Sequence, residues 1–284
     1  MADTALILKR NGWINMFSLN KFSLIITTRC NLRCKLCCEY VPQNKPFADM
    51  TAEECDRILS AAFEVCDHIN TLHLTGGGEP FLHPQLSELI KVAMKYSDKF
   101  DRLMLFTNST ITVKDELLDT ILQNREKILV QLSQYGVKPE FEQNIAKFFL
   151  EKGVNCKIEK YYGDNQSFDG WVDFGPWKSY GRTKDEINSI FDNCAVTRDM
   201  HGNWRTRDGK VHWCSRSMRG MELGFIPDNP DDYVDLLADD TVEYKRNKFK
   251  KIEADRCLTA CDMCSGEQGT YDKSKRFKAA EQEI

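Results

Sequence analysis

The chain has 284 residues, of which 42% are hydrophobic and 29% charged, a composition typical of a soluble globular protein. Its net charge of −4 and isoelectric point near 5.8 exclude the basic footprint of a nucleic-acid-binding protein. The N-terminal residues 1–20 lack the apolar core of a signal peptide, and no apolar run approaches the roughly 18 residues that a membrane span needs. We therefore expect a cytoplasmic protein with no nucleic-acid or membrane partner.

Local patterns predict alternating strands and helices over the first two-thirds of the chain. Short apolar runs predict strands at 22–28, 71–75, 102–107, 127–133 and 154–159, and a sixth near 171–174. Between them we expect a helix after a capping box formed by Thr51 and Glu54, and helices over 84–96, 114–124 and 139–152. Repeated βα units indicate an α/β fold, a partial (β/α)6 TIM-like barrel, with functional residues at the carboxyl ends of its strands.

The remainder of the chain has a different pattern, which predicts a small second module. Residues 203–214 resemble a β-hairpin around Asp208 and Gly209, and residues 257–264 form a short cysteine cluster. We divide the chain into a barrel at 20–188, a cysteine-rich module at 189–270 and a charged tail at 271–284, which we expect to be frayed.

Twelve cysteines are unusual for a chain without a secretory signal, because cytosolic thiols are kept reduced. Clustered reduced cysteines indicate metal ligands or catalytic thiols. Cys55, Cys66 and Cys156 lie at the apolar positions of predicted elements, so we interpret them as buried hydrophobic side chains. The other cysteines fall into two groups.

The first group consists of Cys30, Cys34 and Cys37, directly after the first predicted strand. Three thiolates on a compact loop suit three irons of a [4Fe–4S] cluster and leave the fourth iron open. A zinc knuckle that uses Cys38 as a fourth ligand is the alternative. The Cys-x3-Cys-x2-Cys spacing resembles the radical S-adenosylmethionine (SAM) superfamily, although Leu36 stands where that family often has an aromatic residue. The resemblance covers roughly residues 22–160.

A second motif agrees with this resemblance. Gly77, Gly78, Glu79 and Pro80 follow the second predicted strand and look like the family's Gly-Gly-Glu-Pro motif, which implies that they bind the amino group of SAM. Glycines allow close backbone approach, and Glu79 would accept from an ammonium group.

Two less specific matches to the family lie at the ends of later predicted strands. Asn108 ends the third strand, where the family often carries polar residues near the cofactor. Ser133 ends the fourth strand and resembles a family position that contacts the ribose.

The second cysteine group resembles the auxiliary-cluster modules called SPASM and, in the shorter form, twitch. The stretch from Cys194 to Cys214 matches their opening motif, and Cys261 and Cys264 match the closing Cys-x2-Cys. The resemblance implies that these four thiolates close a second [4Fe–4S] cluster, with Cys257 as an alternative ligand. A structural zinc ribbon is the competing interpretation.

The resemblance implies a radical SAM oxidoreductase that generates a 5′-deoxyadenosyl radical and abstracts hydrogen from its substrate. Because the chain is similar to a twitch-type aminocyclitol dehydrogenase, we expect it to oxidise a secondary alcohol on a small carbohydrate-like molecule, a sugar or cyclitol. The expected cofactors are SAM and two [4Fe–4S] clusters, reduced by a flavodoxin or ferredoxin. The alternatives are a peptide-modifying maturase or epimerase, and a zinc-binding interaction module.

Substrate contacts are expected near the junction of the two modules. Lys178, Arg182 and Arg216 are candidates by composition and position. Forming a ketone also requires a proton acceptor, for which Asp164, Asp173 and Lys178 remain open.

Overall fold

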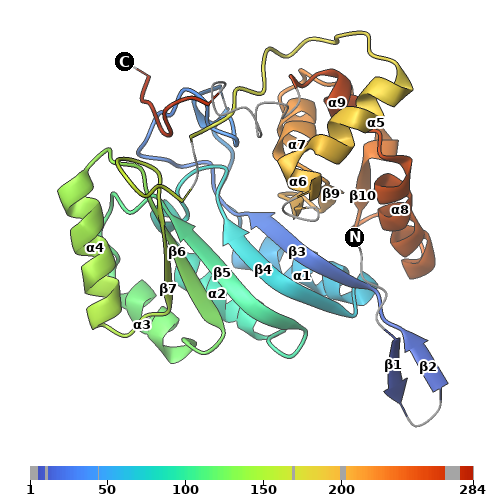
Figure 1. Ribbon diagram of the computed structural model, residues 1–284. Coiled ribbons are helices and arrows are strands. Elements are labelled where there is room, and N and C mark those ends of the chain that lie inside the picture. The colour runs from blue at the N-terminus through green and yellow to red at the C-terminus, as the bar shows by residue number, and fades with distance from the viewer. Residues whose placement is uncertain are drawn as a thin grey trace.

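The computed structural model describes residues 6–9, 12–43, 45–167, 170–198, 203–265 and 276–283 (Figure 1). Strands β1 (Leu6–Lys9) and β2 (Gly12–Asn15) form a separate antiparallel hairpin. None of the helices in these ranges is long and apolar enough to cross a membrane.

An eight-stranded sheet with the order β10-β9-β8-β3-β4-β5-β6-β7 organises the rest of the chain. The five predicted barrel strands are present as β3 (Ser18–Ile25), β4 (His68–Thr75), β5 (Phe100–Thr107), β6 (Ile128–Gln134) and β7 (Cys156–Lys160), all parallel. The mostly parallel sheet confirms the predicted α/β fold.

The sixth parallel strand lies elsewhere than predicted. It is β8 (Trp204–Thr206), which pairs with β3 at the other side of the sheet. Around 171–174 the structure has an isolated bridge between Trp171 and Phe277. Gly170 and Gly175, on either side of this stretch, adopt positive φ angles of 108° and 76°, which interrupt an extended chain.

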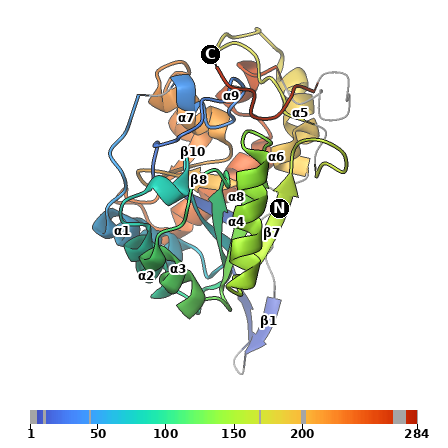
Figure 2. The same cartoon turned by 90° about the vertical axis from the view of Figure 1, so that its left-hand side faces the viewer.

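Helices cover the outer face of the parallel strands (Figure 2). These are α1 (Ala52–Val65), α2 (Leu86–Met94), α3 (Asp115–Gln123) and α4 (Pro139–Glu151), with single turns η1 (Val41–Gln43) and η2 (Pro80–Leu82) in the loops. The predicted capping box is confirmed, because Thr51 Oγ1 accepts from the Glu54 amide at 3.1 Å and Glu54 accepts from the Thr51 amide at 2.8 Å. Leu72, Leu74 and Leu103 belong to the core beneath these helices.

The cysteine-rich part packs on the β8 side of the sheet. It contains α5 (Lys184–Asn193), α6 (Ala195–Arg198), β9 (Lys210–His212), α7 (Ser215–Glu222), η3 (Pro230–Asp232), β10 (Tyr233–Asp235), α8 (Val242–Asp255) and α9 (Thr259–Asp262). The predicted hairpin is confirmed, with Gly209 at φ 103° in the β8–β9 turn. Because β8 hydrogen-bonds to β3, this part extends the barrel sheet.

The C-terminal tail is ordered where the structure describes it, so the prediction of a frayed tail is wrong for residues 276–283. The Lys35 amide donates to the Glu281 carbonyl at 2.8 Å, and the Glu283 amide donates to the Arg33 carbonyl at 2.7 Å. Ala279 and Ala280 are buried. Because its backbone groups and small apolar side chains find partners on another loop, the tail is held in place. Residues 271–275 lie outside the described ranges.

Candidate functional site

The first cysteine loop leaves the carboxyl end of β3 and turns back on itself. Cys30, Cys34 and Cys37 lie close enough for their sulfurs to influence one another electrostatically. The Leu32 amide donates to Cys30 Sγ at 3.4 Å, and Gln282 Nε2 donates to Cys34 Sγ at 3.3 Å. Burial, reinforced by the neighbouring sulfurs, raises the pKa of Cys30 to about 11 and that of Cys34 to about 12. These groups are neutral thiols until a cation displaces their protons.

The donor set of this loop suits an iron–sulfur cluster. It offers three soft sulfur ligands on one loop, and two of the sulfurs already accept N–H hydrogen bonds of the kind that support cluster thiolates. Within the described ranges, no group of three His, Cys, Asp or Glu side chains is gathered closely enough to hold a single metal ion. Cys30, Cys34 and Cys37 would instead each bind a different iron of one cluster.

The glycine-rich turn after β4 packs closely against this cysteine loop. The Glu79 amide donates to the Arg29 carbonyl at 2.6 Å. A Cβ atom on Gly78 would lie 2.1 Å from the same carbonyl oxygen, so a side chain there would force the two backbones apart. Gly76 is equally restricted, because its Cβ would lie 2.4 Å from the Gly78 carbonyl oxygen. The turn therefore needs glycine to sit beside the predicted cluster.

The Glu79 carboxylate points into the protein rather than into open space. The residue is 2% exposed, and its two oxygens accept from the amides of Phe81 at 3.0 Å and Asn108 at 2.6 Å. Burial raises its pKa to about 7, against the lowering effect of these amides. Glu79 ties the turn after β4 to the end of β5, and this geometry gives no support to the predicted direct contact with an ammonium group.

Asn108 connects the same network to the cysteine loop. Its Nδ2 donates to Asn31 Oδ1 at 2.9 Å, and Asn31 Nδ2 donates to Thr110 Oγ1 at 2.7 Å. Ser133, at the end of β6, is buried and hydrogen-bonds to the side chain of Tyr135. The predicted residues at the ends of β4, β5 and β6 thus gather at one edge of the sheet, next to the first cysteine group.

The second cysteine group lines a cavity on the β8 side of the molecule. Cys194 follows α5, Cys214 caps α7, and Cys261 and Cys264 lie in and after α9; all four line one cavity. Burial raises the pKa of Cys214 to about 11, and burial, reinforced by the sulfurs of Cys214, Cys264 and Cys194, raises the pKa of Cys261 well above its ordinary value. Cys257 lies outside this lining.

The surroundings of Cys257 differ from those of the four cysteines in the cavity. The charged groups that act on it are Asp232, Lys184 and Asp255, and no sulfur is among them. Its position therefore favours the set Cys194, Cys214, Cys261 and Cys264 over a set that includes Cys257.

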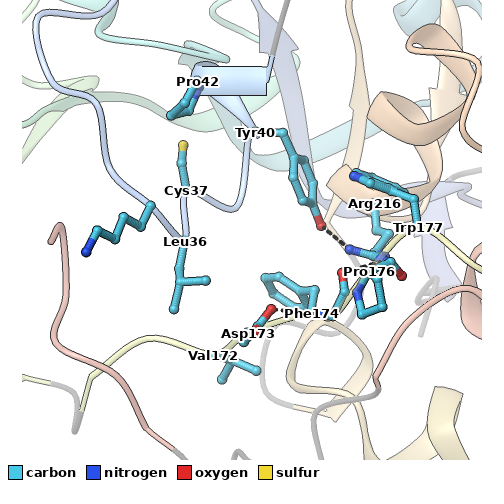
Figure 3. Close-up of a pocket in the computed structure, with 12 residues that line it drawn as sticks. Leu36, Cys37, Tyr40, Pro42, Val172, Asp173, Phe174, Pro176, Trp177 and Arg216 are labelled. Atoms are coloured by element: carbon cyan, nitrogen blue, oxygen red, sulfur yellow. Dashed lines mark hydrogen bonds between the residues drawn. The ribbon is translucent and has the colours of Figure 1, made fainter. Parts of the chain in front are cut away.

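A second cavity, of about 120 Å³, lies between the first cysteine loop and the segment Val172 to Trp177 (Figure 3). Tyr40, Phe174 and Arg216 line both cavities, so one wall separates the two cysteine groups. The Arg216 guanidinium donates to Tyr40 Oη at 3.2 Å and lies 4.0 Å from the Trp177 ring centre. Tyr40 has a φ of 55°, which is rare for a bulky residue and typical of strained functional sites.

Residues 24–159 match the family profile described as the Radical SAM superfamily. This range begins in β3, contains both motifs described above and ends in β7. Residues 24–159 are thus similar to the radical SAM superfamily, over slightly less than half of the 284-residue chain. No curated protein sequence matched the chain.

Two solved structures with bound AdoMet, anSMEcpe and BtrN, share the fold. anSMEcpe with bound AdoMet is 15% identical, with a TM-score of 0.55 over 90% of this chain and 92% of that chain. BtrN in complex with AdoMet and 2-DOIA is 14% identical, with a TM-score of 0.54 over 93% of this chain and 97% of that chain. Streptococcus suis SuiB bound to S-adenosylmethionine is 19% identical, with a TM-score of 0.43 over 63% of this chain. The match spans 38% of the SuiB chain.

Two of the predicted substrate contacts, Arg216 and Arg182, already have hydrogen-bond partners within the protein. Arg216 Nε donates to the Met263 carbonyl at 2.9 Å, and its Nη2 to the Gly175 carbonyl at 3.0 Å. Arg182 Nη1 donates to the carbonyl groups of Cys261 and Cys264, at 2.9 and 2.8 Å. Both arginines brace the second cysteine group, and their contact with a substrate stays a prediction.

Lys178 lies outside both cavities. Its ammonium group sits 5.4 Å from the Tyr180 ring centre, and its side chain is exposed. A direct substrate contact by Lys178 also stays a prediction.

Sequence reasoning missed an ion pair that joins the two cysteine groups. Glu39, two residues after Cys37, accepts hydrogen bonds from Arg205 on β8 and from Ser215 beside Cys214. The side chains of Glu39 and Arg205 are largely buried. No sequence pattern marks this ion pair, because Glu39 and Arg205 come together only through the pairing of β8 with β3.

Proposed function

We propose that this chain is a radical SAM oxidoreductase with two [4Fe–4S] clusters. Cys30, Cys34 and Cys37 would hold the first cluster, and the turn at 76–80 would bind SAM beside it. Cys194, Cys214, Cys261 and Cys264 would hold the second. The observation that carries the proposal is the wall of Tyr40, Phe174 and Arg216, which both cavities share. A molecule in the first cavity would lie within reach of both cysteine groups.

We further propose that the substrate is a small polar molecule such as a sugar or cyclitol. The cavity beside Cys37 has a volume of about 120 Å³, which holds several water-sized groups and is small for an extended peptide. Its walls combine aromatic rings, which suit the apolar face of a sugar, with an arginine and a carboxylate. BtrN, which has the same fold, was solved with 2-DOIA.

When bound, SAM and the two clusters would supply a hydrogen-abstracting radical and an acceptor for the remaining electron. Converting a secondary alcohol to a ketone also releases one proton, which the protein must accept. Among the described residues that line the two cavities, Asp173 carries the one carboxylate. Its Oδ1 accepts from the Gly175 amide at 2.8 Å, which holds the carboxylate in place. We therefore assign the proton to Asp173, whose exposed side chain can pass it on to solvent.

Replacing Asp173 with asparagine is expected to lower the rate of ketone formation by about 10²- to 10⁴-fold, because the amide cannot take the proton. Iron content and SAM binding should stay unchanged, since the Gly175 amide still finds an oxygen acceptor. Product formation under anaerobic single-turnover conditions measures the effect. Asp164→Asn is the matched control, because Asp164 is exposed like Asp173 but lies outside both cavities. Equal losses in the two variants would remove Asp173 from the mechanism.

A substrate screen tests the proposed reaction itself. The reduced protein, with flavodoxin or ferredoxin as electron donor, is incubated with SAM and either aminocyclitols and sugars or short peptides. Formation of 5′-deoxyadenosine together with a ketone from the first set supports the proposal. anSMEcpe shares the fold and was solved with AdoMet and the Cp18Cys peptide, so a peptide-modifying activity is the second candidate. Product from peptides alone would establish it in place of alcohol oxidation.

A further inference from the structure

The C-terminal segment 276–283 runs along the first cysteine loop as a short strap. Its start is fixed by reciprocal backbone hydrogen bonds between Trp171 and Phe277, at 2.8 and 2.9 Å. Further along, Cys34 and Gln282 form an antiparallel bridge. The strap therefore touches one of the three cysteines predicted to hold the first cluster, although 248 residues separate Cys34 from Gln282.

The side chain of Gln282 is fixed by three hydrogen bonds. Its Oε1 accepts from the Arg33 amide at 2.7 Å, and its Nε2 donates to the Ala280 carbonyl at 2.6 Å and to Cys34 Sγ at 3.3 Å. Exchanging the oxygen and nitrogen would set N–H against N–H at Arg33 and oxygen against oxygen at Ala280, so the network defines the orientation. An N–H donor is therefore held toward the Cys34 sulfur.

We propose that Gln282 is a positioning residue that tunes the reduction potential of the cluster held by Cys30, Cys34 and Cys37. The inference rests on the first cluster of the proposed function. Reduction adds negative charge to a cluster and its thiolates, and an N–H donor to a ligand sulfur stabilises that charge. The hydrogen bond from Gln282 thus favours the reduced state that SAM cleavage requires. Buried Ala279 and Ala280 also shield this side of the loop from water, which strengthens the hydrogen bond.

The test compares Gln282→Met with the wild-type protein after anaerobic reconstitution with iron and sulfide. Methionine has a similar length but no donor, so we expect the same iron content and a more negative midpoint potential for the first cluster. A redox titration followed by electron paramagnetic resonance (EPR) measures the shift. Glu281→Gln is the control, because it removes only the exposed ion pair with Lys35 and should leave the potential unchanged.

Gln282→Glu supplies an independent check if the methionine variant loads less iron. It keeps an oxygen for the Arg33 amide, loses the donor to Cys34 and adds negative charge, so its potential should also be more negative than that of wild type. Loaded Gln282 variants with the wild-type potential would overturn the inference. Wild-type protein that takes up no iron on the first loop would instead overturn the proposed function.

Discussion

Replacing Cys30, Cys34 and Cys37 together with alanine is expected to abolish SAM cleavage and to remove about four of about eight iron atoms per chain. The three thiols are the soft ligands on the loop that faces the glycine-rich turn, and the structure brings their sulfurs into mutual electrostatic contact. Without them no open iron is present to bind SAM. Iron and sulfide analysis of anaerobically reconstituted protein, together with 5′-deoxyadenosine release, measures both losses.

Cys38→Ala is the matched control for this experiment. Cys38 adjoins Cys37 but lines the cavity of the second cysteine group. The variant should keep its iron and its SAM cleavage. A zinc-containing protein that loses its metal on Cys38→Ala would support the zinc-knuckle alternative and contradict the cluster assignment.

Replacing Cys194, Cys214, Cys261 and Cys264 with alanine is expected to remove the other four iron atoms, about half of the total, and to stop product formation. SAM cleavage should persist at a reduced and uncoupled level, because the first loop and the glycine-rich turn are untouched. Without an acceptor for the second electron, oxidation of the alcohol cannot be completed. The ratio of product to 5′-deoxyadenosine reports this uncoupling.

Cys257→Ala separates the two possible ligand sets. Cys257 is surrounded by charged side chains rather than by sulfurs, so the variant should retain all of its iron and its product ratio. Loss of half of the iron in Cys257→Ala, with Cys261→Ala unaffected, would replace the proposed set by one that includes Cys257.

Local sequence patterns predicted the parallel strands because each signal lies within a few residues. β3 to β7 each contain apolar residues at buried positions within a short segment, and the capping box at Thr51 spans only four positions. β8 was predicted as a strand of the hairpin at 203–214, but its parallel pairing with β3, with Ser23 opposite Arg205, was not, because the three-residue strand carries no signal for a partner so far away. Pairing over such a separation leaves no periodic trace in the sequence.

Cysteine spacing indicated both groups in the site, but the roles of charged residues depended on tertiary contacts. Glu79 was expected to face a ligand, yet two backbone amides hold its carboxylate inside the protein. Arg216 was expected to meet a substrate; the structure adds bonds to carbonyl groups and Tyr40 that the sequence did not indicate, and the substrate contact stays a prediction. No sequence pattern predicted a role for Gln282, because its hydrogen-bond partner Cys34 lies near the opposite end of the chain. A side chain's hydrogen-bond partners follow from packing, which composition and spacing do not encode.

The most direct test of the central claim is the EPR spectrum of the reduced protein before and after addition of SAM. If Cys30, Cys34 and Cys37 leave one iron open, SAM will bind that iron, change the cluster signal and yield 5′-deoxyadenosine. The same change should be absent from the variant that lacks these three cysteines. Protein that carries zinc in place of iron, or a cluster signal that SAM leaves unaltered, would contradict the account.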